Sequence, residues 1–322
     1  MIFETQWRHL VKSPKGFFVY VSGVLSGIAS LLIKFFRENI SGESMKSQYN
    51  ISQFKLIVSD LDGTIKDTDQ PIHPFTIEVL TRLPELGIHF TLASGRSLAS
   101  LRPYAEELKI KIPMVLANGC VIQSLDGTIH FREPMPVEVT RKILKITDQQ
   151  NCDLVIFSDD RLYFKSMTDN IDRIFGKLKN SVHVVGSWDA IEHLLPEVNK
   201  FMIIDWQSQE NLAKLESIFD HELNGQAEYL RTNINHLEVM PKGVNKATGL
   251  KRLADEMHIS MDEILAFGDF ENDVAMLAEV GLGVAVENAC ELAKQNANLI
   301  VGSCADNGPA EFLDQLISQQ QI

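Results

Sequence analysis

The sequence predicts an α/β protein with a Rossmann-like parallel-sheet core and an inserted α+β cap domain. Short apolar runs alternate with helical patterns at 53–134 and again at 237–322. Such alternation with short connections is typical of right-handed crossovers in a parallel sheet. The segment between them, 135–236, mixes two or three helices with short strands. The core is therefore expected to be assembled from two separate stretches of the chain, with the cap domain inserted between them.

The first stretch of the core reads as strand, helix, strand, helix, strand. The run FKLIVS is apolar and ends at the turn-forming DLDGT, which predicts a buried parallel strand leading into a loop. Pro74 can open a helix and Gly87 can end it. In chain order, the expected elements are a strand at 54–59, a helix at 74–86, a strand at 88–93, a helix at 101–108 and a strand at 114–117.

A β-hairpin that turns at Asp126 and Gly127 is expected across 121–131. Short strands follow in the inserted segment, for example at 154–157, 163–165 and 201–204. The alternation of helices and strands then returns. The elements expected there are a helix at 246–257, a strand at 264–267, a helix at 273–279, a strand at 283–286 and a final helix after Pro309.

Composition and charge restrict the class of partner. The chain has 322 residues, of which 45% are hydrophobic and 23% are charged, as in soluble globular proteins. A formal net charge of -13 disfavours nucleic acid as the partner, because binding to a phosphate backbone needs a basic face. The four cysteines are scattered without metal-ligand spacing and are compatible with a reducing compartment.

Residues 1–52 are expected to be a leader and linker outside the catalytic part of the chain. Residues 16–33 carry no charge and have about the minimum length for a helix that crosses a bilayer. Two interpretations stay open, a membrane anchor and a dispensable leader upstream of a true start at Met45. In either case the catalytic domain is expected in the cytoplasm, with membrane association only through 16–33.

Polar residues follow three of the predicted strands. In a parallel sheet, the loops at the carboxyl ends of the strands build the active site. Asp60 and Asp62 come directly after the first strand, and two carboxylates so close together need a counter-charge such as a hard divalent cation. The segment SLDGT at 124–128 has the same tail, but Ser124 replaces the first aspartate, so we interpret it as an ordinary hairpin turn.

Other residues can complete a phosphate site. Ser94 offers a hydroxyl to a phosphoryl oxygen, and Gly95 permits a close backbone approach. Lys246 can neutralise charge on a phosphoryl group and on Asp60, although most lysines are solvated on the surface. In GDFENDVAML, Asp269 is expected to bind a metal directly. Asp273 is expected either to orient metal-bound water or to cap the following helix.

Four segments in this order, DLDGT, ASGR, a lysine in KGVNK and GDFENDVAML, resemble the haloacid dehalogenase (HAD) superfamily of phosphatases. The insertion before KGVNK resembles the large-cap, Cof-type branch, and ANG at 117–119 and NGPA at 307–310 are similar to that branch's SNG and DNGVA segments. Ser94 stands where the branch usually has threonine, and Pro309 where it usually has valine. The similarity starts near residue 54, and the leader has no counterpart in it.

The resemblance implies Mg²⁺-dependent hydrolysis of small phosphate esters through an aspartyl-phosphate on Asp60. Asp62 would protonate the leaving alcohol and then activate water. Mg²⁺ would be held by Asp60, the main-chain carbonyl of Asp62 and Asp269, with Asp273 beside them. The inserted domain would close over the site and select the substrate.

The implied substrate-binding residues supply hydroxyl, amide and cationic groups around the phosphoryl oxygens; they are Ser94, Gly95, Arg96, Asn118, Lys246 and Asn272. Of these, Arg96 and Asn118 would face either the substrate or the cap, and Thr64 would brace the nucleophile loop.

Two other readings stay open: a phosphomutase on the same scaffold, and a phospho-accepting signalling or binding domain. The acid/base position of Asp62 and the long insertion both argue against the second of these. A non-enzymatic binding module with a relict site is disfavoured because the motif set is intact.

Overall fold

The computed structural model describes residues 10–12, 18–20, 49–67, 70–150, 152–178, 181–206 and 209–320. The chain divides into two compact units, Met1–Asn50 and Ile51–Ile322. In the first unit, β1 (Leu10–Lys12) pairs antiparallel with β2 (Phe18–Tyr20). The membrane helix expected at 16–33 lies outside the described residues except for β2. Among the described residues, no helix is long and apolar enough to span a bilayer.

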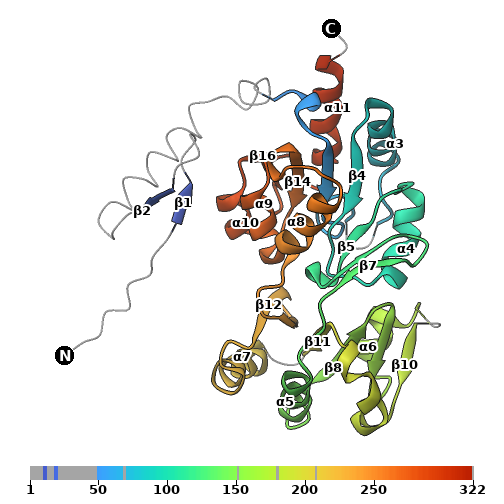
Figure 1. Ribbon diagram of the computed structural model, residues 1–322, viewed down its shortest axis with the longest axis vertical. Helices are drawn as coiled ribbons and strands as arrows, with labels where there is room; N and C mark the ends of the chain where they lie inside the picture. Colours follow the sequence, from blue (N-terminus) through green and yellow to red (C-terminus); the bar gives the residue numbers. More distant parts are fainter. Residues whose placement is uncertain are drawn as a thin grey trace. The chain divides into compact units, whose positions relative to one another are not determined.

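A five-stranded parallel sheet forms the centre of the second unit, as the sequence predicts (Figure 1). All four pairings within it are parallel. In spatial order its strands are β16 (Leu299–Val301), β15 (Leu282–Val286), β14 (Ile264–Gly268), β3 (Leu56–Ser59) and β4 (His89–Leu92). β3 and β14 are therefore neighbours, although more than half of the chain separates them. This adjacency brings the two stretches of the core together.

The helices of this core begin and end close to the predicted positions. They are α3 (Pro74–Arg82), the 3-10 turn η2 (Leu83–Leu86), α4 (Leu98–Glu107), α8 (Lys246–Glu256), α9 (Val274–Glu279) and α11 (Gly308–Gln320). The short helix α10 (Glu291–Asn296) was not among the expected elements. Gly87 ends η2 in the left-handed region at φ 74°, which glycine adopts without steric penalty. Helices α3 and α11 contact each other, and α9 contacts both α8 and α10.

The third predicted strand differs from expectation in its partners. β5 (Met114–Leu116) belongs to a separate antiparallel sheet with β6 (Val121–Gln123) and β7 (Ile129–Arg132). A parallel bridge between Ala93 and Val115 continues the central sheet to β5. β5 has only three residues and pairs mainly with β6, the first strand of the hairpin that follows it. The expected hairpin turn is present, with Gly127 N–H donating to the carbonyl of Ser124.

The inserted segment forms a six-stranded mixed sheet (Figure 1). In spatial order its strands are β10 (Val182–Val184), β9 (Arg161–Phe164), β8 (Asp153–Ser158), β11 (Lys200–Ile204), β13 (His236–Pro241) and β12 (Ala227–Asn233). Its helices are α5 (Val137–Thr147), α6 (Asp169–Phe175), η4 (Trp188–Glu197) and α7 (Gln209–Leu223). β13 continues past 236, where the predicted insertion ends, and leads directly into α8.

Alternating side chains give this sheet two buried faces. Ile156, Phe201 and Val239 pack in the cluster that includes residues of α5 and α7. Phe157 and Ile204 lie on the opposite face, in the cluster with residues of α6. The period of two along each strand explains this division, because neighbouring side chains point to opposite faces.

Candidate active site

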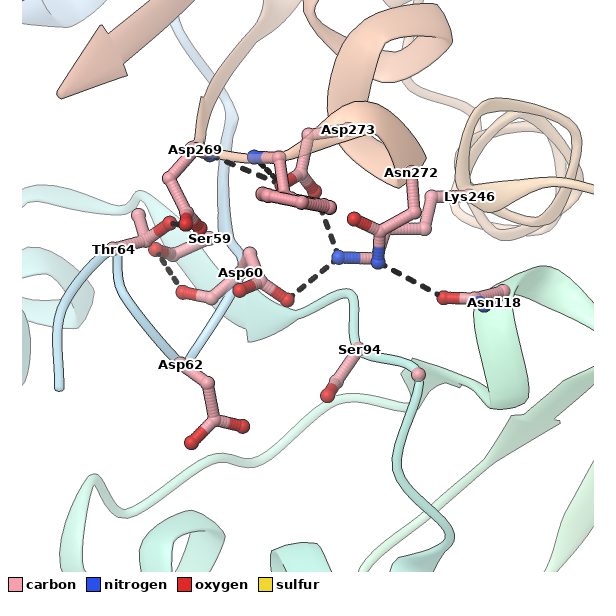
Figure 2. A network of polar contacts seen from close by, with 12 residues as sticks. Ser59, Asp60, Asp62, Thr64, Ser94, Asn118, Lys246, Asp269, Asn272 and Asp273 are labelled. Atoms are coloured by element: carbon pink, nitrogen blue, oxygen red, sulfur yellow. Dashed lines mark hydrogen bonds and ion pairs between the residues drawn. The ribbon is translucent and has the colours of Figure 1, made fainter. Parts of the chain in front are cut away.

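Three aspartates, Asp60, Asp269 and Asp273, lie close together where β3 and β14 end. Ser59 is in register with Phe267, and Asp60 N–H donates to the carbonyl of Phe267 at 3.0 Å. This pairing places Asp60 next to the loop that carries Asp269 and Asp273. Carboxylate oxygens of these three residues lie within 4.8 Å of one another. The parallel register therefore accounts for the convergence that the sequence predicts (Figure 2).

Lys246 lies between two of these carboxylates. Its Nζ donates to Asp60 Oδ1 at 2.6 Å and to Asp273 Oδ1 at 2.7 Å. The side chain has no exposed surface, so the surface-lysine interpretation is wrong. Lys246 is the first residue of α8, whose start is capped by Asn245 and Thr248 in a capping box. A well-defined helix start thus holds the ammonium group in place.

Asp273 organises the loop after β14. Its Oδ2 accepts hydrogen bonds from the backbone N–H groups of Asp269, at 3.0 Å, and Phe270, at 3.1 Å. Because its Oδ1 already binds Lys246, both oxygens have partners within the protein. These contacts match the expected capping role, and Asp269 is the more accessible of the two carboxylates on this loop.

Thr64 anchors Asp269 from the other loop. Thr64 Oγ1, in the loop that follows β3, donates to Asp269 Oδ1 at 2.7 Å. Gly63 has φ +83°, and a Cβ at this position would lie 2.5 Å from Asp269 Oδ2. Glycine is therefore required here both by backbone conformation and by space.

Burial strongly shifts the ionisation of this cluster. Burial raises the pKa of Asp60 well above its ordinary value; Lys246 opposes this shift, and Asp273 and Asp269 add to it. Burial, followed by the charge of Asp273, raises the pKa of Asp269 to about 7. Burial by itself would lower the pKa of Lys246, but Asp273 and Asp60 outweigh it and hold the ammonium charged. The cluster therefore lacks positive charge, and a cation would relieve it.

Asp62 lies apart from the three-carboxylate cluster and is held by Arg96. Arg96 Nε donates to Asp62 Oδ2 at 2.6 Å, and its second terminal nitrogen donates to Oδ1 at 2.7 Å. The Tyr104 ring centroid lies 5.4 Å from the guanidinium carbon. The Asp62 side chain is 39% exposed. Arg96, expected to face either the substrate or the cap, contacts the carboxylate predicted to be the acid/base.

Ser94 and two asparagines line the other side of the site (Figure 2). Ser94 is buried, and its Oγ accepts from the backbone N–H of Arg96 at 3.2 Å. Asn272 Nδ2 donates to Asn118 Oδ1 at 3.2 Å. A Cβ on Gly95 would lie 3.1 Å from the same oxygen, so the backbone passes close to Asn118 here. Of the six predicted substrate-binding residues, five follow the carboxyl ends of β4, β5 and β14, and Lys246 lies at the start of α8.

Sequence reasoning missed two buried charges that approach these loops from the inserted sheet. Lys200 Nζ donates to the carbonyl of Gly95 at 2.6 Å, and Glu238 accepts from Asn118 Nδ2. The available signal was a lysine and a glutamate within otherwise apolar strands, KFMII and HLEVMP. A charged residue is rarely buried without a partner, so a charge within an apolar strand indicates a specific polar contact.

Comparisons with known proteins identify relatives of this chain. A family model described as haloacid dehalogenase-like hydrolase matches residues 57–313. An HMP-PP phosphatase of Yersinia pseudotuberculosis is 26% identical over 272 residues, which cover 84% of this chain and 97% of that protein.

Solved structures share the fold. A haloacid dehalogenase-like hydrolase from Bacteroides thetaiotaomicron superposes with a TM-score of 0.73 at 26% identity, covering 82% of this chain and 99% of the other. A HAD/COF-like hydrolase from Plasmodium vivax reaches 0.75 at 22% identity, covering 83% of this chain and 96% of the other.

Proposed function

The chain belongs to the haloacid dehalogenase-like hydrolase family and is a Cof-type phosphoric monoester hydrolase, and we propose that it dephosphorylates small metabolites through a phosphorylated Asp60. The family match spans 57–313 and confirms the resemblance seen in the four sequence segments. The observation that carries the proposal is the buried cluster of Asp60, Asp269 and Asp273 around Lys246. Three carboxylates and an ammonium group lie together there, which supports a role for one carboxylate as nucleophile and for the others in holding a metal ion.

Asp60 is the proposed nucleophile. Its Oδ1 is held by Lys246, which leaves Oδ2 for attack on phosphorus. A bond forms between this oxygen and phosphorus while the bond from phosphorus to the ester oxygen breaks. Asp62 gives its proton to the departing oxygen and later takes a proton from water. That water attacks phosphorus, releases inorganic phosphate and restores the Asp60 carboxylate.

The donor set suits Mg²⁺, a hard cation that prefers oxygen ligands. Thr64 occupies Asp269 Oδ1, which leaves Oδ2 of that carboxylate for a metal ion, and Asp60 Oδ1 has a second lone pair beside the one that accepts from Lys246. Mg²⁺ would be held by these two side chains and the main-chain carbonyl of Asp62, with Asp273 supporting the loop. When bound, Mg²⁺ supplies positive charge that screens the phosphoryl oxygens from the carboxylates.

The phosphoryl oxygens are expected to meet Ser94 Oγ, Lys246 Nζ and Asn272 Nδ2. Gly95 allows close approach of the backbone, and Asn118 acts through Asn272. Arg96 is expected to act through Asp62, since both oxygens of that carboxylate accept from its guanidinium. The ion pair would keep Asp62 pointed toward the open side of the site until an ester binds.

The substrate class is a small phosphorylated metabolite, such as a sugar phosphate, a nucleotide or a phosphorylated cofactor. The relative from Yersinia pseudotuberculosis is named for action on HMP-PP, at 26% identity. The inserted domain, 135–236, is the part proposed to choose among such compounds.

The full-length protein is expected to hydrolyse p-nitrophenyl phosphate with Mg²⁺ and to lose this activity in EDTA. Release of inorganic phosphate and of nitrophenolate should be equal, because hydrolysis forms one of each. Addition of Mg²⁺ after EDTA should restore turnover. Unchanged turnover in EDTA would contradict the metal assignment. Absence of turnover with this ester and with a panel of sugar, nucleotide and cofactor phosphates would contradict the hydrolase assignment.

Mg²⁺ binding is expected to tighten as the pH rises toward 7 and then to level off. The metal must displace the proton that Asp269, with a pKa of about 7, holds at lower pH. One displaced proton changes the apparent dissociation constant about tenfold per pH unit. Because this pKa lies above that of the unfolded chain, metal-free stability falls as the pH rises through 7, so the Mg²⁺-induced gain in Tm should be largest near pH 8.

Titration calorimetry between pH 5.5 and 8.5 measures this dependence. Thr64→Val is the matched variant, since the Thr64 hydrogen bond lowers the pKa of Asp269 and its loss should move the profile to higher pH. An affinity independent of pH over this range would contradict proton displacement.

A further inference from the structure

Two fully buried charges join the inserted sheet to the loops of the active site. Lys200 is the first residue of β11, and Glu238 lies in the neighbouring strand β13. Lys200 Nζ and Glu238 Oε1 are 2.9 Å apart, with side-chain exposures of 0% and 3%. Desolvating two charges costs more than their attraction usually returns, and an apolar pair often stabilises a fold equally well. The charges therefore call for an explanation other than stability.

The Lys200 ammonium group has three partners. Besides Glu238, it donates to the carbonyl of Gly95 at 2.6 Å and lies 4.1 Å from the centroid of the Phe157 ring. Gly95 belongs to the Ser94–Gly95–Arg96 loop, while Phe157 belongs to β8 of the inserted sheet. The contact consequently holds a loop of the core against two strands of the insertion.

Glu238 sets the orientation of two amides in the site. A carboxylate can only accept hydrogen bonds, so Asn118 must turn its NH₂ group toward Glu238. The Asn118 oxygen then faces Asn272, which must donate to it with its own NH₂ group. The buried Glu238 carboxylate thus fixes which group donates and which accepts in both hydrogen bonds, from Asn118 to Glu238 and from Asn272 to Asn118.

We propose that Lys200 and Glu238 are positioning residues that set the phosphoryl-binding geometry from the side of the inserted domain. Lys200 holds the backbone of the Ser94–Gly95 loop, and Glu238 orients Asn272 so that its amide N–H remains available to a phosphoryl oxygen. Neither residue contacts the reacting atoms. Asn118, buried and at φ 57° in the left-handed region that asparagine tolerates, connects the pair to the site. This inference rests on the proposed phosphatase function.

The test compares Glu238→Gln, Lys200→Met and the double variant. Glutamine presents one acceptor and one donor, so it cannot satisfy both Lys200 and the Asn118 NH₂ group. Each single variant is expected to raise the inhibition constant of inorganic phosphate and the KM for p-nitrophenyl phosphate by about 10–100-fold, as loss of an outer-shell partner does in metal sites. Tm should fall in the single variants, because each leaves a buried group without its partner.

The double variant separates positioning from stability. With neither charge of the Lys200–Glu238 pair left, its Tm should return toward that of the unsubstituted protein. Phosphate binding should stay weak, because the carbonyl of Gly95 still lacks the Lys200 donor that holds its loop. Lys165→Met is the control, because Lys165 pairs with Asp148 on the exposed surface of the same domain and should leave binding unchanged. Recovery of both Tm and phosphate binding in the double variant would overturn the proposal.

Backbone hydrogen exchange measures, independently of turnover, whether the Lys200–Glu238 pair restrains the loops of the site. Residues 94–97 and 117–120 should exchange faster in Lys200→Met and in the double variant, and unchanged exchange there would overturn the proposal even if no ester were hydrolysed. Lack of turnover by the unsubstituted protein, with exchange altered as expected, would count against the phosphatase function and not against the coupling of the pair to the loops.

Discussion

Asp60→Asn is expected to lower kcat by at least about 10⁴-fold, on the scale seen when a catalytic nucleophile is removed. An amide has the shape of the carboxylate, but it cannot form the phosphorylated intermediate. The fold should survive, because the Asp60 negative charge is repelled by Asp273 and Asp269, and the substitution removes this repulsion. Turnover of p-nitrophenyl phosphate and a thermal melt, measured on the same preparation, check both statements.

The hairpin at 124–128 offers a matched control for this variant. Asp126 stands in SLDGT, accepts from Thr128 N–H at 2.9 Å and is fully exposed. Asp126→Asn should leave kcat unchanged. Rapid quench of the unsubstituted protein should also place the phosphoryl group on the peptide that contains Asp60. Wild-type turnover by Asp60→Asn, or a label on another peptide, would contradict the nucleophile assignment.

Lys246→Met is expected to destabilise the fold by about 3–5 kcal/mol as well as to abolish turnover, because breaking a buried ion pair leaves uncompensated charge. Asp60 and Asp273 both lose their cation. Without the ammonium group the pKa of Asp60 rises further, so stability is lost as the pH increases through the raised pKa values. The loss should be larger at pH 8 than at pH 5.5, and Mg²⁺ should restore part of it.

Urea unfolding at both pH values, with and without Mg²⁺, measures this effect. The control is Lys55→Met: Lys55 pairs with Glu263 at 2.7 Å, but its side chain is 57% exposed. Its loss should change the free energy of unfolding by at most about 1 kcal/mol. Equal destabilisation by the two variants would contradict the view that Lys246 neutralises a buried acidic cluster.

Much of the fold follows from local patterns. The apolar runs that become β3, β4 and β14 stop at polar turns, and Pro74 and Gly87 mark both ends of one helical segment. The same reasoning separated DLDGT from SLDGT, and the structure confirms that the second copy is a hairpin turn. The partners of β5 were less predictable, since a three-residue apolar strand fits either a parallel or an antiparallel neighbour.

The candidate site was predictable where topology dictates it. Because parallel strands end at one edge of the sheet, Asp60 and Asp269 had to approach each other once β3 and β14 were neighbours. Side chains that reach across the molecule were not predictable in this way. Arg96 donates to Asp62, and Lys200 donates to the carbonyl of Gly95, and no spacing in the sequence predicts either contact.

The sequence by itself therefore determined the α/β class, the order of the catalytic segments and the identity of the residues at the strand ends, because each depends on neighbours in the chain. Only the tertiary structure decided the protein environment of each charge. Lys246 is buried between two carboxylates, Asp62 is paired with arginine, and Glu238 directs the amide of Asn118. These outcomes depend on desolvation and on contacts between distant segments, which arise only when the two sheets and their loops pack together.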